Sequence, residues 1–120
     1  MNNEILNRVK IKFAQGDKEL ENAKDNLNYF YDGKIRAIAR RAAGFYLEGF
    51  AIYFNKERYG NSFINHLRGL QNDNTIPLKI KLSSKELTQK MTNDYLSGID
   101  AISHAETIIN YCKEEVYKSI

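Results

Sequence analysis

The sequence predicts an all-α fold, an antiparallel bundle of four or five helices in a single domain over residues 1–120. Apolar residues recur at steps of three and four along most of the chain, which keeps them on one face of a helix. The one segment with a period of two is short, and a lone strand has no partner with which to form a sheet. With 120 residues, 42% of them apolar, the chain is long enough to bury one core without a disulfide or a metal.

Composition excludes several classes of protein. A single cysteine, Cys112, cannot form an internal disulfide, so a secreted scaffold held by disulfides is excluded. The longest apolar runs have about four residues, far fewer than the roughly 20 that cross a membrane. The polar N-terminus lacks the residue order of a signal peptide. We therefore expect a cytoplasmic protein that makes no membrane contact.

The first third of the chain predicts one long helix. Apolar residues from Ile5 to Phe30 follow steps of four and three, which corresponds to about seven turns. Gly16 falls on this apolar face, so it marks either a break or a place where another helix packs closely. Asp32-Gly33 is interpreted as the turn that ends the helix, because glycine readily adopts the backbone angles found there.

Residues 35–53 predict a central helix. Their apolar face is wide, which indicates neighbours on more than one side. Several residues on it are small enough for a partner backbone to approach closely: Ala39, Ala42, Ala43, Gly44 and Gly49. We expect this helix to form the middle of the bundle.

The rest of the chain predicts shorter elements and a final helix. Ser62 is expected to cap a short helix that reaches Leu70. Residues 76–82 alternate in polarity and are interpreted as an extended connector across the bundle, with a helix as the alternative. Ser83 and Glu86 have the spacing of a capping box, which predicts the start of a helical segment that ends near the C-terminus. Residues 92–94 are a place where that segment can be interrupted.

Positive charge gathers in the middle of the chain. Residues 34–91 carry 11 basic and 4 acidic residues, whereas the two ends together carry 7 and 11. The basic residues that could contact nucleic acid or a protein partner are Arg36, Arg40, Arg41, Arg58, Arg68, Lys79 and Lys81. Such residues bind phosphates, and Tyr46, Tyr53 or Tyr59 could stack on bases. The alternative is that the basic middle pairs with the acidic ends, within one chain or across a homodimer.

Motifs for metal, cofactor or nucleophilic chemistry are missing from the sequence. His66, His104 and Cys112 do not have the spacing of zinc ligands, and no glycine-rich phosphate loop is present. We therefore expect no metal and no cofactor, and Cys112 to pack in the core. Arg58 and His66 flank the start of the short helix and could hold a phosphate and transfer a proton, which suits metal-independent RNA cleavage. The alternative is that Arg58 is a solvated loop residue and His66 lies on the helix surface.

Parts of the chain resemble HEPN-like domains, which are small bacterial helical bundles. The segment KIRAIARRAAGFYLEGFA at 34–51 is similar to their second helix, and NDYL at 93–96 begins a stretch similar to their last one. The segments ENAKDNL at 21–27 and YDGK at 31–34 look like an uncharacterised group of such proteins. The nuclease signature of the family places its His closer to its Arg than the seven residues between Arg58 and His66 here.

The resemblance therefore implies a non-enzymatic HEPN-like binding or dimerisation module. Its partner would be a second copy or another protein, with nucleic acid as a further candidate through the basic central face. The alternative is a metal-independent HEPN-type ribonuclease that uses Arg58 and His66.

Overall fold

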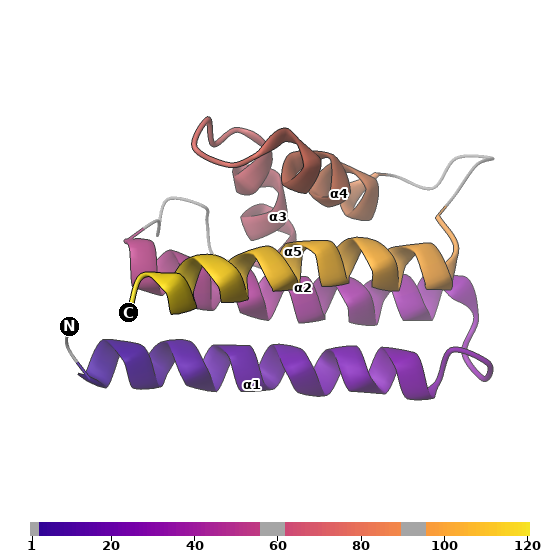
Figure 1. The fold of residues 1–120 in the computed structure, drawn as a ribbon. Helices are drawn as coiled ribbons and strands as arrows, with labels where there is room; N and C mark the ends of the chain where they lie inside the picture. Colours follow the sequence, from indigo (N-terminus) through magenta and orange to yellow (C-terminus); the bar gives the residue numbers. More distant parts are fainter. Residues whose placement is uncertain (1–2, 56–61, 90–95) are drawn as a thin grey trace.

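The structure, a computed structural model, describes residues 3–55, 62–89 and 96–120. Every regular element in these ranges is an α-helix, which confirms the predicted all-α class. The helices are α1 (Asn3–Asp25), α2 (Asp32–Phe54), α3 (Phe63–Gln71), α4 (Leu78–Thr88) and α5 (Gly98–Lys118) (Figure 1). None of the five combines the length and the hydropathy of a membrane span.

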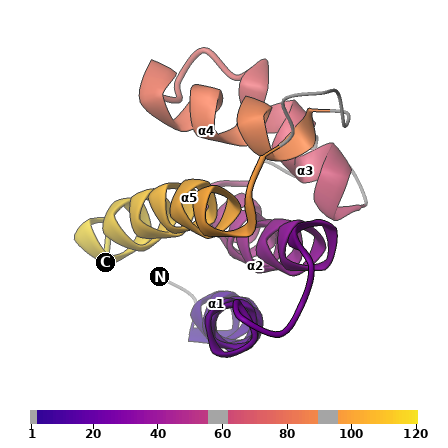
Figure 2. The same ribbon diagram turned by 90° about the vertical axis from the view of Figure 1, so that its right-hand side faces the viewer.

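Helix α2 forms the centre of the molecule, as its wide apolar face predicted. It contacts each of the other four helices. Helix α1 lies along one side of α2, α5 lies beside it, and the α3–α4 pair covers the opposite side (Figures 1 and 2). Most of the buried apolar side chains join in one continuous core that includes residues of all five helices.

The helices do not all run antiparallel to their neighbours. The chain reverses between α1 and α2, but α5 runs parallel to α2 (Figure 1). At the start of the two parallel helices the Asp32 carboxylate accepts a hydrogen bond from the Gly98 amide at 2.9 Å. Toward their ends the rings of Phe50 and Tyr111 lie 5.9 Å apart. The predicted antiparallel order is thus wrong for this pair, because the chain passes through α3 and α4 and returns before α5 begins.

Helix α1 continues through Gly16 without a break. A Cβ atom at this position would lie 2.5 Å from Cδ2 of Tyr46 and 3.0 Å from the Ala42 carbonyl oxygen. The first distance is shorter than real Cβ contacts and the second is unusually tight, so glycine lets the Tyr46 ring lie directly against the α1 backbone. Of the two interpretations of Gly16, close packing is the one confirmed.

The predicted turn at Asp32-Gly33 is instead the start of α2. Helix α1 ends earlier, at Asp25, and the chain turns over residues 26–30. Leu27 and Phe30 still pack against buried residues, which explains why the apolar spacing continued past the helix end. Asp32 suits the first turn of a helix because a carboxylate there is stabilised by the helix dipole.

The interpretation of residues 76–82 as extended is wrong, because α4 begins at Leu78. Its buried face consists of Ile80, Ser83, Ser84 and Leu87, which have helical spacing. Leu78 and Leu82, which made the pattern look alternating, are 69% and 51% exposed. A helix satisfies its own backbone groups, whereas a strand here would have left them without partners.

The predicted caps have different outcomes. Ser62 caps α3 as predicted, accepting a hydrogen bond from the Asn65 amide at 3.2 Å. Ser83 does not start a helix; it lies inside α4 and contacts His104 of α5, with 3.1 Å between Oγ and Nδ1. The final helix begins after Ser97, whose hydroxyl accepts from the Asp100 amide at 3.1 Å. The predicted interruption at 92–94 lies outside the described residues.

Candidate functional site

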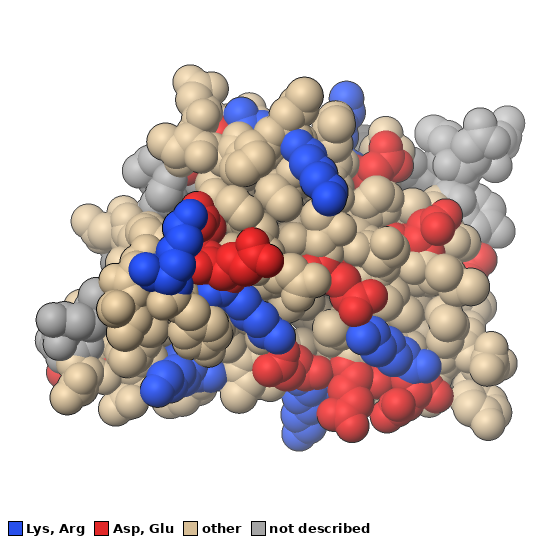
Figure 3. All heavy atoms as spheres, viewed as in Figure 1, with Lys and Arg blue, Asp and Glu red and all other residues tan. Residues whose placement is uncertain are grey.

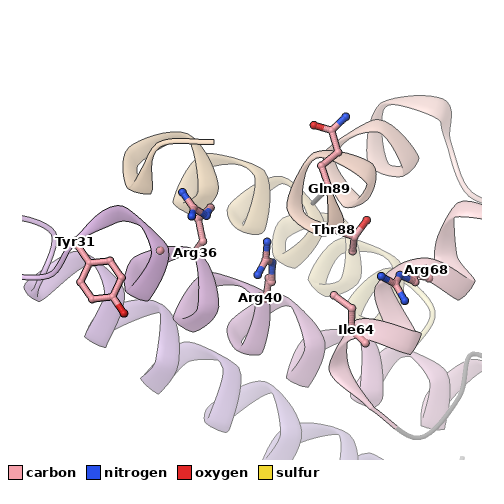
Figure 4. Close-up of a pocket in the computed structure, with 8 residues that line it drawn as sticks. Tyr31, Arg36, Arg40, Ile64, Arg68, Thr88 and Gln89 are labelled. Atoms are coloured by element: carbon pink, nitrogen blue, oxygen red, sulfur yellow. The ribbon is translucent and has the colours of Figure 1, made fainter. Parts of the chain in front are cut away.

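A pocket of about 490 Å³ lies between the first half of α2, helix α3 and the C-terminal end of α4. Arg36 and Arg40 reach it from α2, one helical turn apart, and Arg68 reaches it from α3 on the far side of Ile64 (Figure 4). Tyr31, Gly33, Thr88 and Gln89 complete the described lining. Three of the seven basic residues singled out in the sequence therefore line one hollow.

Two of these arginines also hold the fold together. Arg36 is 3% exposed, and its Nη1 donates to the Leu96 carbonyl at 2.6 Å, just before α5. The Nε of Arg40 donates to the Leu87 carbonyl in the last turn of α4. Carbonyls in the last turn of a helix have no partner within the helix, so they need an outside donor. Arg36 and Arg40 thus fasten the end of α4 and the start of α5 to α2.

The electrostatics of the pocket favour an anion. Burial lowers the pKa of Arg40, and the nearby positive charge of Arg36 lowers that pKa further. None of the described lining residues is acidic. No ion pair between two described residues includes Arg40 or Arg68. With Nε of Arg40 bound to a carbonyl, its planar fork of Nη groups remains to donate to a ligand.

The other predicted basic residues do not join the pocket. Arg41 pairs with Glu19 of α1 at 3.3 Å. Lys79 and Lys81 lie on α4 but do not line the pocket, and Arg58 lies outside the described residues. Neighbouring positions on a helix point about 100° apart, which is why Arg40 and Arg41 serve different surfaces.

Elsewhere, acidic and basic residues pair with each other. On the face shown in Figure 3, red and blue side chains intermingle over the lower half of the molecule. Lys24 pairs with Glu106 at 2.9 Å, and Lys113 with Asp17 at 3.8 Å, so lysines from the chain's ends neutralise acidic residues from the ends. Among ion pairs of described residues, Arg41–Glu19 is the one in which a basic residue of the middle pairs with an acidic residue of an end. None of these pairs neutralises Arg40 or Arg68 at the pocket.

The aromatic residue at the pocket differs from those predicted. Tyr46 is buried, its hydroxyl donates to Asp17 at 2.5 Å, and its ring stacks on Phe13. Tyr53 packs against the core, and Tyr59 lies outside the described residues. Tyr31, in contrast, is 76% exposed at the rim of the pocket. Tyr31 directly precedes Asp32-Gly33, which the sequence analysis interpreted as the end of a helix. Because α2 begins there instead, Tyr31 lies at the start of the helix that carries Arg36 and Arg40.

His66 is buried rather than on the helix surface. It is 6% exposed, with Nε2 3.7 Å from Oε1 of Glu48, and Glu48 also binds Lys12 at 2.9 Å. Its Nδ1 is buried and has no hydrogen-bond partner in the described structure. Arg58, its predicted catalytic partner, lies outside the described residues. His66, the described member of the predicted catalytic pair, thus faces α2 and the Lys12–Glu48 ion pair.

The burial of His66 predicts a loss of stability in acid. Burial lowers the pKa of His66 from its ordinary 6.5; Glu48 opposes this shift, and Lys12 adds to it. The unfolded chain therefore binds a proton that the folded chain does not, and the free energy of unfolding falls as the pH falls through 6.5. Urea unfolding at about pH 7.5 and about pH 5.5 should show this fall reduced in His66→Gln.

His104→Gln is the matched control because the second histidine lies half-buried on α5, away from this ion pair. If His66→Gln reduces the fall no more than this control does, His66 does not titrate as its burial requires.

The described residues offer no site for metal or thiol chemistry. The described residues contain no group of three or more His, Cys, Asp or Glu that could hold a metal ion. Cys112 is fully buried in the core, as predicted. The arginine pocket is therefore the candidate site.

Comparison of the chain with protein-family models, with curated proteins and with solved structures gives no match. The resemblance to HEPN-like domains therefore stays a prediction.

Proposed function

We infer that this protein is a non-enzymatic binding module whose arginine pocket takes the phosphates of a single-stranded nucleic acid. The observation that carries the proposal is the grouping of Arg36, Arg40 and Arg68 in one pocket without an acidic residue among the described lining. Phosphate contacts from arginine and lysine supply most of the affinity of proteins for nucleic acid. Arginine is especially suited to them because its planar fork matches two phosphate oxygens.

The residues of the site favour a single strand over a duplex. Proteins that bind single strands combine a cationic groove for the backbone with aromatic side chains on which bases stack. Here Arg40 and Arg68 would follow the backbone, while exposed Tyr31 offers a ring at the rim. A base in a duplex is already stacked, so Tyr31 could contribute only to binding a strand whose bases are free.

The test is binding of fluorescently labelled oligonucleotides, followed by anisotropy. Single-stranded RNA and DNA should bind with an affinity that falls steeply as salt is added. Arg40→Gln and Arg68→Gln should each weaken binding about tenfold, because each removes a charge-assisted hydrogen bond to phosphate. Each should also reduce the slope of log affinity against log salt by about 0.7.

Arg41→Gln is the matched control, since Arg41 lies on the same helix but pairs with Glu19 away from the pocket. It should bind nearly as tightly as the wild type. Equal weakening by all three substitutions would show that net charge acts rather than the pocket. No binding to any strand at low salt would overturn the proposal.

Catalysis is not part of the proposal, because the described structure buries His66 against Glu48. RNA incubated with the protein should keep its length. Self-association, the other role implied by the HEPN-like resemblance, stays a prediction that light scattering can measure.

A further inference from the structure

We propose, on the basis of the proposed function, that the pocket recognises the phosphorylated end of a single strand rather than a phosphate within it. A terminal phosphate is a phosphomonoester, and an internal one is a phosphodiester. The two differ in charge, in the number of free oxygens and in access to a concave site. Each of these differences favours the terminal phosphate in this pocket.

Charge favours the phosphomonoester. Arg40 of α2 and Arg68 of α3 line the pocket on either side of Ile64, and no described lining residue is acidic (Figure 4). A phosphomonoester carries a charge of about −1.5 to −2 at pH 7, whereas a phosphodiester carries a single negative charge. A cation that is partly removed from water, as Arg40 is, gains most from the ligand with the larger opposite charge.

The number of hydrogen-bond acceptors points the same way. A terminal phosphate has three free oxygens and an internal one has two, because the second ester bond occupies an oxygen. The Nη fork of Arg40 can engage two oxygens, and Arg68 approaches from the other helix (Figure 4). The three free oxygens of a strand end therefore offer more acceptors to Arg40 and Arg68 than the two of an internal phosphate.

The space around the phosphate supplies an independent reason. The cavity of about 490 Å³ falls within the range of about 300–1,000 Å³ typical of small-molecule pockets, and its α2 wall includes the buried Arg36. An internal phosphate carries a sugar on each side, so both sugars must be accommodated in the pocket or at its rim. A strand end enters with one sugar, and its last base can then stack on Tyr31 at the rim.

The test compares oligonucleotides of one sequence that carry a 5′-phosphate, a 3′-phosphate or hydroxyl groups at both ends. At least one phosphorylated form should bind about tenfold more tightly than the hydroxyl form, in line with one added charge-assisted contact. Arg40→Gln should abolish this preference, and Arg41→Gln should retain it. Should Arg40→Gln fail to fold, Arg68→Gln makes the same test with an exposed side chain.

Equal binding of all three oligonucleotides would overturn the preference for strand ends while leaving the proposed function intact. No binding of any of them would overturn both. Inorganic phosphate and a nucleoside monophosphate serve as competitors, and each should displace the phosphorylated strand. A phosphoserine peptide that competes better than the strand would assign the pocket to a protein ligand and overturn the proposal.

Discussion

Gly44→Leu should destabilise the protein by about 2–3 kcal/mol and displace α3 from α2. Gly44 is buried on α2 where the ring of Phe63 lies against the backbone. A Cβ atom at position 44 would lie 2.6 Å from Cβ of Phe63 and 2.7 Å from its Cγ, so the first residue of α3 would have to move. The higher helix propensity of leucine, about 1 kcal/mol over glycine, does not compensate for this overlap. Urea unfolding measures the effect.

The same substitution should weaken nucleic-acid binding, because α3 carries Arg68 and Ile64 into the pocket. Ala37→Leu is the control: Ala37 is exposed on α2, so the stability should change by about 0.5 kcal/mol or less. Phe63→Ala combined with Gly44→Leu should recover at least about 1 kcal/mol relative to the sum of the two single changes. Additive effects would show that Gly44 and Phe63 do not meet as described.

Cys112 should react with a thiol reagent at least about 1,000-fold more slowly in the native protein than in the unfolded chain. The reactive form is the thiolate, and complete burial raises the pKa of the Cys112 thiol far above its ordinary value. Reaction therefore requires that α5 open away from the core. The rate of reaction with dithionitrobenzoate, with and without guanidinium chloride, measures the difference.

Ser103→Cys provides the comparison on the same helix, since Ser103 is exposed on α5. This variant should show one fast equivalent from position 103 and one slow equivalent from Cys112. Two fast equivalents in the native protein would show that the inner face of α5 is not buried against α2.

The periodicity of apolar residues was sufficient to predict the helices with long apolar faces. It predicted the all-α class, the central place of α2 and the burial of Cys112, all of which the structure confirms. The cap at Ser62 could also be predicted, because a cap depends on residues three positions apart. These features share one cause, which is that they depend on neighbours in the sequence.

Contacts between distant parts of the chain decided the remainder. Four alternating apolar residues could not reveal that 78–82 are helical, because Leu78 and Leu82 face solvent and Ile80 faces the core. The parallel course of α2 and α5 depends on where α3 and α4 bring the chain before α5 begins. His66, for which the sequence left a surface position as one alternative, is buried against Glu48 of α2, which also pairs with Lys12 of α1.

The candidate site shows the same division. The sequence by itself determined that positive charge gathers in residues 34–91, and it identified Arg36, Arg40 and Arg68 among several candidates. Only the tertiary structure decided that these three share a pocket with Tyr31, while Arg41 pairs with Glu19 on another side of the helix. The reason is physical: helical spacing sets the direction in which a side chain points, but the packing of other helices sets what it meets there.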